Sequence, residues 1–185
     1  MMKNYTVVKR EDTGVVLDFL PNGHPFMERR QPVAQVLGEQ YFTLLEVVPK
    51  EGIFLTPNEI VYLGPDKRDK VHHIIGKIGT EQLTQTAKSE LPFIIEDIVN
   101  KNEKKYVDFF NNASPVSSRY HEIELLPGIG KKNMWKILDE RKIKPFESFE
   151  DIKKRVELLP DPKKSIIKRI ILEIEGEDKY KVFIK

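Results

Sequence analysis

The chain has 185 residues, of which 39% are hydrophobic and 32% are charged, and its formal net charge is +2. This composition is typical of a folded globular protein with enough apolar side chains for a core. The absence of cysteine excludes disulfides, cysteine nucleophiles and thiolate metal sites. No apolar run approaches the roughly 18 residues of a membrane-spanning helix, and residues 1–5 contain no apolar signal core. We therefore expect a cytoplasmic protein without membrane contact.

The first 78 residues contain short apolar runs that are rich in β-branched residues and separated by Gly and Pro turns. Such runs predict β-strands. We expect them at residues 5–8, 14–20, 32–38, 41–48, 60–63 and 71–78. This number of short strands favours a small barrel, and we predict an OB-like barrel over residues 1–78. On the strand pattern alone, an SH3-like barrel fits nearly as well.

Two basic clusters in this predicted barrel are candidates for contacting nucleic acid. Arg29 and Arg30 fall in one predicted loop, and Lys67, Arg68 and Lys70 fall in another. Four aromatic side chains are candidates for stacking on bases: Tyr41, Phe42, Phe54 and Tyr62. For each residue taken singly we favour the alternative, in which the aromatic rings fill the barrel and the charges are solvated.

Residues 79–116 have a net charge of −2 and read as a helical connector. Apolar residues recur there at helical spacing, which predicts helices over residues 80–112. Pro92 interrupts this pattern and is expected to kink or break the helix.

The most informative run is residues 125–132, Leu-Leu-Pro-Gly-Ile-Gly-Lys-Lys. We expect a helix over residues 117–124, a tight turn, and a second helix that starts at Lys131. Pro127 helps to end the first helix, and the turn predicts positive φ angles at Gly128 and Gly130. Ile129 is expected to fill the gap between the two helices.

The start of this second helix is a candidate phosphate site. The first turn of a helix has unpaired N–H groups and carries the positive end of the helix dipole. The glycines leave the approach open, and Lys131 and Lys132 add positive charge. Residues 119–185 hold 17 Lys and Arg against 13 Asp and Glu. Such a site would bind a backbone phosphate whatever the base sequence. The alternative is an ordinary helix pair joined by a glycine turn.

A second turn of similar sequence, residues 159–164, follows about 33 residues later, which indicates an internal duplication. Leu-Pro and the paired lysines recur with one residue deleted. Both glycines are lost, and Asp161 places a carboxylate where a phosphate would sit, so we expect this second turn to be structural. Before it, Ser148 and Asp151 have the spacing of a helix N-terminal cap, and a helix is expected through Leu159. Residues 180–184 alternate as in a terminal strand.

The run from Leu126 to Lys132 resembles the helix-hairpin-helix motif of nucleic-acid-binding proteins. Nearly the whole chain is similar to an uncharacterised archaeal family of predicted nucleic-acid-binding proteins that pairs an OB-like barrel with a helix-hairpin-helix module. The segments that carry this resemblance are residues 23–25, 32–35, 42–46, 68–70, 124–132, 134–135 and 145–151. The resemblance implies nucleic-acid binding, to RNA rather than DNA.

The expected fold is therefore α+β: an OB-like β-barrel (1–78), a helical connector (79–116) and an all-α duplicated helix-hairpin-helix domain (117–185). We expect a non-enzymatic nucleic-acid-binding protein without cofactor or metal. Its predicted binding residues are Gly128, Ile129, Gly130, Lys131, Lys132, Arg29, Arg30, Lys67, Arg68 and Lys70.

Two other functions stay open. The first is a protein–protein adaptor that uses the duplicated helical module, with Trp135 as an interface anchor; we prefer a buried Trp135. The second is an enzyme like the helix-hairpin-helix DNA glycosylases, with Asp151 as the catalytic residue, although its cap spacing argues against this role. Four histidines lack the spacing of a metal site: His24, His72, His73 and His121.

Overall fold

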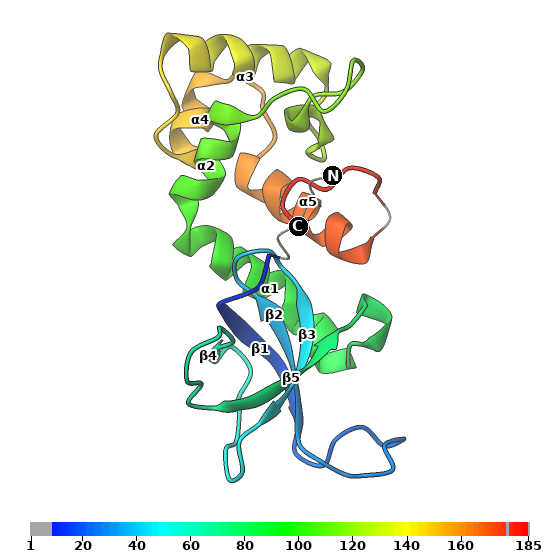
Figure 1. The fold of residues 1–185 in the computed structure, drawn as a ribbon. Coiled ribbons are helices and arrows are strands. Elements are labelled where there is room, and N and C mark those ends of the chain that lie inside the picture. Colours follow the sequence, from blue (N-terminus) through cyan, green and yellow to red (C-terminus); the bar gives the residue numbers. More distant parts are fainter. Residues whose placement is uncertain (1–8, 177, 185) are drawn as a thin grey trace, which may run out of the picture. The chain divides into compact units, whose positions relative to one another are not determined.

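The computed structural model describes residues 9–176 and 178–184 (Figure 1). These residues form two compact units. The first extends to Ile94 and includes Phe183 and Ile184, and the second spans Ile95–Val182. The boundary falls inside helix α1 (Gln85–Lys101). The strand expected at residues 5–8 lies outside the described residues.

The first unit contains a sheet of five antiparallel strands (Figure 1). Its strands are β1 (Thr13–Leu20), β2 (Val33–Gly38), β3 (Leu44–Pro49), β4 (Ile60–Tyr62) and β5 (Val71–Lys77). Their order in the sheet is β4-β1-β2-β3-β5, so β4 and β5 are its edges. All five were predicted from sequence, and the sheet curls into half a barrel. The finer assignment to an OB-like or SH3-like barrel stays a prediction.

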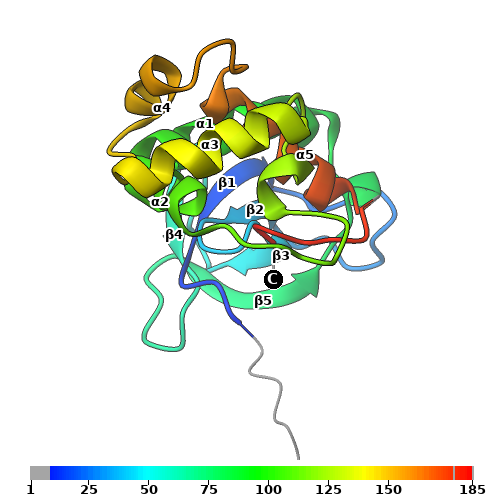
Figure 2. The ribbon, with the colours of Figure 1, turned by 90° about the horizontal axis from the view of Figure 1, so that it is seen from above.

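Irregularities in strand pairing account for the curl of the sheet. The register of β1 against β2 shifts between Val16 and Asp18. The register of β3 against β5 shifts twice, beside Val47 and beside Pro49. An extra residue in one strand bends that strand and increases its twist. Accordingly, β5 follows a wide arc along its edge of the sheet (Figure 2).

Every residue of the central strand β2 is buried, so the sheet is covered on both faces at this strand. One face contributes to an apolar cluster of Val16, Ala34, Val36, Leu45, Val47, Leu55, Val61, Leu63 and Val71. Gln35 points to the other face, because neighbouring side chains in a strand alternate. Its amide donates to the carbonyl of Gln82 (2.9 Å) and accepts the N–H of Thr84 (2.9 Å). These bonds hold the short helix η1 (Thr80–Gln82) and the start of α1 against the sheet.

The helices expected over residues 80–112 are confirmed as η1, α1 and α2 (Glu103–Asn112). Pro92 lies inside α1 and does not end it. The helical run is instead interrupted at Asn102. Its side-chain amide donates to the carbonyl of Ile98 (2.8 Å), which satisfies an acceptor near the end of α1.

Four further helical segments follow in the second unit: η2 (Glu122–Leu125), α3 (Lys131–Ile143), α4 (Phe149–Arg155) and α5 (Pro162–Glu175). The expected helix over residues 117–124 is wrong. A loop occupies most of this stretch, closed by a bridge between Pro115 and His121, and only η2 is helical. The physical reason is local: the Ser117 hydroxyl accepts the N–H groups of Arg119 (3.2 Å) and Tyr120 (3.1 Å), which competes with helical bonding.

Two other expectations are also wrong. The helix predicted through Leu159 ends at Arg155, and Leu158 is fully outside it, with a φ of 60° and a side chain that is 90% exposed. Residues 180–184 form no strand. Side chains of α5 bind the backbone there instead: Glu173 accepts the N–H of Val182 (2.7 Å). No helix in the described residues combines the length and apolarity that crossing a membrane requires.

Candidate functional site

The turn between η2 and α3 contains the residues that the sequence marked most strongly. Gly128 has a φ of +83°, a conformation that glycine adopts without strain. Gly130 has a φ of −86° and a ψ of −179°, which is ordinary extended backbone. The prediction of a positive φ is therefore correct for Gly128 and wrong for Gly130. Ile129 is buried, with 4% of its surface exposed, as its predicted packing role requires.

Gly130 matters because it has no side chain. It is the residue immediately before α3, and no side chain caps this helix. A β-carbon placed on Gly130 would meet no atom within 4 Å. The first N–H bonded within the helix is that of Met134, which donates to the carbonyl of Gly130 (2.9 Å). The N–H groups before it have no helical acceptor, and the first turn contains no acidic residue. The start of α3 is therefore chemically open.

The two helices that follow α3 are each capped by the side chain of the residue before them. Before α5, the Asp161 carboxylate accepts the N–H groups of Lys163 (3.0 Å) and Lys164 (3.2 Å). Before α4, the Ser148 hydroxyl accepts the N–H of Asp151 (2.9 Å). These three bonds satisfy N–H groups that would otherwise be available to a ligand. The cap at Ser148 and the carboxylate at Asp161 are as the sequence predicts.

Positive charge adjoins the open end of α3. Lys131 and Lys132 are exposed, and neither forms an ion pair within the described part of the chain. Trp135 follows one helical turn later and is 58% exposed, which contradicts the expectation that it is buried. Two exposed lysines therefore lie in the first turn of an uncapped helix, and an exposed tryptophan follows in the next turn.

Side chains of α5 hold the first turn in place. The Ser165 hydroxyl donates to the carbonyl of Pro127 (2.9 Å), and the Arg169 guanidinium donates to the carbonyl of Leu125 (3.2 Å). Pro160 of the second turn faces Gly128: a β-carbon on Gly128 would lie 3.4 Å from its Cγ. The second turn and its helix therefore support the backbone of the first.

Arg169 is itself fixed by buried charges. Its side chain is 2% exposed, and its Nε donates to Glu173 Oε1 at 2.9 Å. Its Nη1 also donates to Asp178 Oδ2 at 2.7 Å, and its Nη2 binds the carbonyl of Tyr180. A buried charge needs such partners to offset its desolvation. Sequence reasoning missed this arginine, because it lies among the buried positions of α5, where periodicity predicts an apolar residue.

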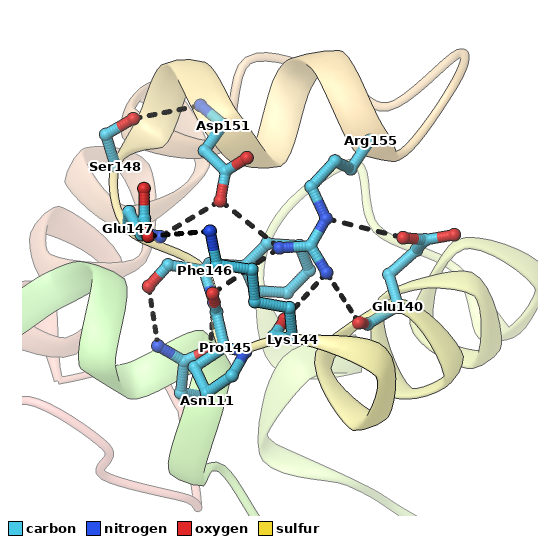
Figure 3. A network of polar contacts seen from close by, with 9 residues as sticks. All are labelled: Asn111, Glu140, Lys144, Pro145, Phe146, Glu147, Ser148, Asp151 and Arg155. Carbon is cyan, nitrogen blue, oxygen red and sulfur yellow. Dashed lines mark hydrogen bonds and ion pairs between the residues drawn. The ribbon is translucent and has the colours of Figure 1, made fainter.

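Arg155 is the centre of a second polar network (Figure 3). Its Nη2 donates to the carbonyls of Glu140 and Lys144, both at 2.6 Å. Its Nη1 donates to Asp151 Oδ2 (3.2 Å), and its guanidinium lies 4.6 Å from the ring centre of Phe146. The Lys144 carbonyl has no helical donor, because it lies at the end of α3. The Glu140 carbonyl also accepts the Lys144 N–H (3.3 Å), so it receives a second donor from Arg155. The network therefore joins the end of α3 to the start of α4.

The contacts of Asp151 define its role in this network. Its carboxylate accepts the N–H of Glu147 (3.0 Å) and the Arg155 guanidinium. Burial alone would raise the pKa of Asp151, but the Glu147 N–H and the Arg155 charge outweigh it, so the pKa lies below the usual value. The carboxylate is held ionised at the start of α4 as a structural acceptor.

The basic candidates of the first unit lie in two loops and form no cluster through any described contact. Arg29 and Arg30 are exposed between β1 and β2, and Lys67 is exposed between β4 and β5. Arg68 donates its Nε to the carbonyl of Gly64 (2.9 Å). Lys70 is paired with Glu59, and this hydrogen bond lowers the pKa of Glu59.

The aromatic candidates of the first unit differ in exposure. Phe42 is buried, as favoured from sequence, but Phe54 is 75% exposed. The alternation of apolar residues assigns a residue to one face of a strand, but it does not show whether another segment covers that face. Phe54 lies in the loop after β3, where the sequence has no periodicity to use.

The comparisons with known proteins give a family. Residues 10–185 match the model of the family described as a protein of unknown function (DUF655), and the chain belongs to this family.

Two relatives are archaeal proteins. The chain is 44% identical over 179 residues to the uncharacterized protein MJ0038 of Methanocaldococcus jannaschii, which covers 96% of this chain and 81% of that protein. It is 50% identical to Af1531 of Archaeoglobus fulgidus, whose crystal structure matches with a TM-score of 0.86 over 95% of this chain and 100% of that one.

Proposed function

We propose that this chain is a non-enzymatic nucleic-acid-binding protein that holds a backbone phosphate at the start of α3. In this proposal, η2, the turn and α3 act as a helix-hairpin-helix unit, and the curled sheet acts as an OB-like barrel. The single observation that carries the proposal is the open start of α3, in contrast to the start of α5, which Asp161 closes. RNA is the ligand that the sequence resemblance favours over DNA.

Simple electrostatics supports a phosphate at this position. The start of a helix carries about half a positive elementary charge, and its free N–H groups point outwards at a bound anion. Lys131 and Lys132 add two full charges without an ion pair to neutralise them within the described residues. The backbone N–H groups and the lysines contact phosphate and not a base edge, so this binding is independent of base sequence.

The turn before α3 is expected to bind nucleic acid only weakly by itself. Each neutralised phosphate contributes about −0.7 for single strands, or about −0.9 for a duplex, to the slope of log affinity against log salt. One turn with two lysines neutralises few phosphates, so its affinity falls modestly with salt. Useful affinity then needs a second contact surface on the same chain or a partner.

The experiment compares two double charge reversals. Each replaces the pair of lysines at the start of one helix, α3 or α5, by glutamates. Fluorescence anisotropy measures the affinity for labelled single- and double-stranded RNA and DNA at two salt concentrations. The test variant is Lys131→Glu/Lys132→Glu. The matched control is Lys163→Glu/Lys164→Glu, which changes the same charge at the start of α5, where Asp161 already fills the anion position.

The proposal predicts that the first variant loses most of its affinity and that the control keeps most of it. Thermal unfolding of both variants confirms that they are folded. An equal loss in both would mean that overall charge binds the nucleic acid and that the open turn has no special part.

Asp151 supports the non-enzymatic proposal. Its carboxylate is committed to the Glu147 N–H and to Arg155, and its pKa is lowered. A general base that works near neutral pH needs a raised pKa and room to reach a substrate. The glycosylase-like alternative therefore gains no support from this residue.

A protein adaptor is the second candidate function, and the exposure of Trp135 favours it. Trp135 is 58% exposed and Ile143, at the end of the same helix, is 78% exposed. Exposed aromatic residues are frequent anchors of protein interfaces. A folded wild-type protein that bound none of the four nucleic acids would favour this candidate over the first.

A further inference from the structure

Three adjoining hollows lie along one side of the first unit. Their volumes are about 500, 240 and 530 Å³. Lys50 and His72 line both the first and the second hollow, while Pro65 and Arg68 line both the second and the third. The three hollows therefore adjoin one another at the residues that they share. Residues of the edge strand β5 line all three, so we call this surface the β5 track.

One end of the track presents aromatic rings. Phe54 is 75% exposed, and its ring meets Phe19 edge-on, with ring centres 5.8 Å apart at an angle of 82°. This contact supports the Phe54 ring while leaving most of it open. His72 and His73 are exposed on β5 and line the same hollow. Open aromatic rings are the surfaces on which unpaired bases stack.

The other end of the track has an apolar floor. Leu45 and Leu63 of the buried cluster, together with Ile74 packed against it, line the 530 Å³ hollow. Gly76 also lines it, and a β-carbon there would meet no atom within 4 Å. A hollow of this volume lies within the range of small-molecule sites, which is about 300–1,000 Å³.

Cationic side chains border the whole length of the track. They are Lys9, Arg10, Lys50, Lys67, Arg68 and Lys77. Four acidic residues also line the track. One of them, Glu11, is only 6% exposed. Its carboxylate accepts the N–H groups of Gln40 (2.9 Å), Tyr41 (2.9 Å) and Thr43 (3.1 Å). Its charge is therefore used inside the protein. The other three acidic residues, Asp12, Glu51 and Asp66, are exposed, so the six cations leave the border an excess of positive charge. This excess complements a polyanion, and the floor and rings complement flat apolar groups.

We propose that the β5 track binds single-stranded nucleic acid, with bases on Phe54 and in the hollows and phosphates on the cationic border. This inference rests on the proposed function and names its ligand more closely. A duplex keeps its bases stacked inside, whereas a single strand presents their faces to aromatic side chains. The track thus supplies the second contact surface that is needed because the turn before α3 binds weakly by itself.

The experiment measures the affinity of the full chain for fluorescein-labelled oligouridine of about 12 nucleotides, a length within the site sizes of small barrel domains. A duplex of equal length is the second probe. The track variants are Phe54→Ala and Lys77→Glu, both at exposed side chains. Lys88→Glu is the matched control, because Lys88 is exposed on α1 and lines none of the three hollows.

Loss of one stacked base is expected to weaken single-strand binding about 5- to 150-fold in Phe54→Ala. Duplex affinity should not change in this variant. Lys77→Glu should weaken single-strand binding and lower its salt dependence, while Lys88→Glu should do neither. Wild-type single-strand affinity in both track variants would overturn the proposal.

The fluorescence of Trp135 separates this proposal from the proposed function. Trp135 is the only tryptophan of the chain, and it lies one helical turn after Lys131. If the track variants keep full affinity while Lys131→Glu/Lys132→Glu abolishes binding and the Trp135 response, the track is wrong and the α3 turn stands. If the wild type binds no nucleic acid at all, the proposed function fails and the track fails with it.

Discussion

Ser165 donates its hydroxyl to the carbonyl of Pro127 at 2.9 Å, and this bond joins α5 to the turn before α3. Ser165 is buried on α5, the helix whose own start Asp161 closes. Pro127 precedes the glycine with the positive φ angle. A side chain of α5 thus helps to fix the backbone of the turn before α3.

Ser165→Ala tests this support. The variant removes a neutral hydrogen bond, so the free energy of unfolding should fall by about 1 kcal/mol. Urea unfolding followed by circular dichroism measures the change. Ser89→Ala is the control, because Ser89 is exposed on α1 and bonds only within its own helix, to the carbonyl of Gln85. A similar loss in both variants would show that the Ser165–Pro127 bond contributes nothing specific.

Gly128→Ala should also destabilise the fold. The φ of +83° costs an L-residue about 1–2 kcal/mol, although the site has room for a β-carbon. Gly76→Ala is the comparison, because Gly76 has no positive φ and a β-carbon there meets no atom within 4 Å. Thermal unfolding should show a lower midpoint for the first variant alone. Equal midpoints would contradict the account of the turn.

Stability should depend on pH through His121. Burial and the nearby Arg141 lower the pKa of His121 below its ordinary 6.5, against the opposing effect of Glu122 and Glu124. In the unfolded chain the ring takes up a proton near pH 6.5, but in the folded protein it does so only at lower pH. The free energy of unfolding should therefore fall as the pH drops from 6.5 towards the folded-state pKa.

The control for this pH effect is His121→Asn. His121 Nδ1 accepts the N–H of Ile123 (3.1 Å) at the start of η2, and asparagine can accept the same bond without titrating. Urea unfolding between pH 5 and 7 should show a smaller pH dependence in the variant. An unchanged slope would assign the effect to other groups.

Arg155→Lys should weaken the second unit although it keeps the charge. The planar guanidinium of arginine donates to three acceptors, which are the carbonyls of Glu140 and Lys144 and the carboxylate of Asp151. The single ammonium group of lysine cannot reach all three. We expect a loss of roughly 2 kcal/mol in the free energy of unfolding. Arg119→Lys makes the same chemical change at an exposed loop residue and should stay within about 0.5 kcal/mol. If Arg155→Lys were equally mild, the network in Figure 3 would not be an important contributor.

Local signals in the sequence predict much of the fold. The strands β1 to β5 and the start of α3 were found because β-branched runs, glycine and proline mark strands and turns directly. The position of the Asp161 carboxylate at the start of α5 was predicted correctly. A carboxylate just before a helix accepts the free N–H groups of the first helical turn.

The incorrect predictions concern segments whose conformation or exposure depends on a competing local hydrogen bond or on a contact with a distant segment. Ser117 diverts the backbone of the expected helix before η2 into a loop. Trp135 lies on a helix that was predicted correctly to start at Lys131, but the sequence does not reveal which faces of that helix its neighbours leave open. Arg155 and Ser165 act through carbonyl groups of other segments, which no sequence spacing encodes.

Gly130→Asp tests whether the open start of α3 holds a phosphate. The φ of −86° and ψ of −179° suit an aspartate cap, and nothing lies within 4 Å of the added β-carbon. The variant reproduces at α3 the internal carboxylate that Asp161 supplies at α5. Its free energy of unfolding should be unchanged or higher by about 0.5 kcal/mol.

The measurement is the anisotropy titration of Gly130→Asp with labelled RNA beside the wild type. The account predicts a protein that is at least as stable as the wild type and has lost binding at the α3 turn, seen as a large drop in affinity and no response of Trp135 fluorescence. Wild-type affinity with an unchanged Trp135 response in this variant would contradict the account, because an occupied anion position cannot also hold a phosphate.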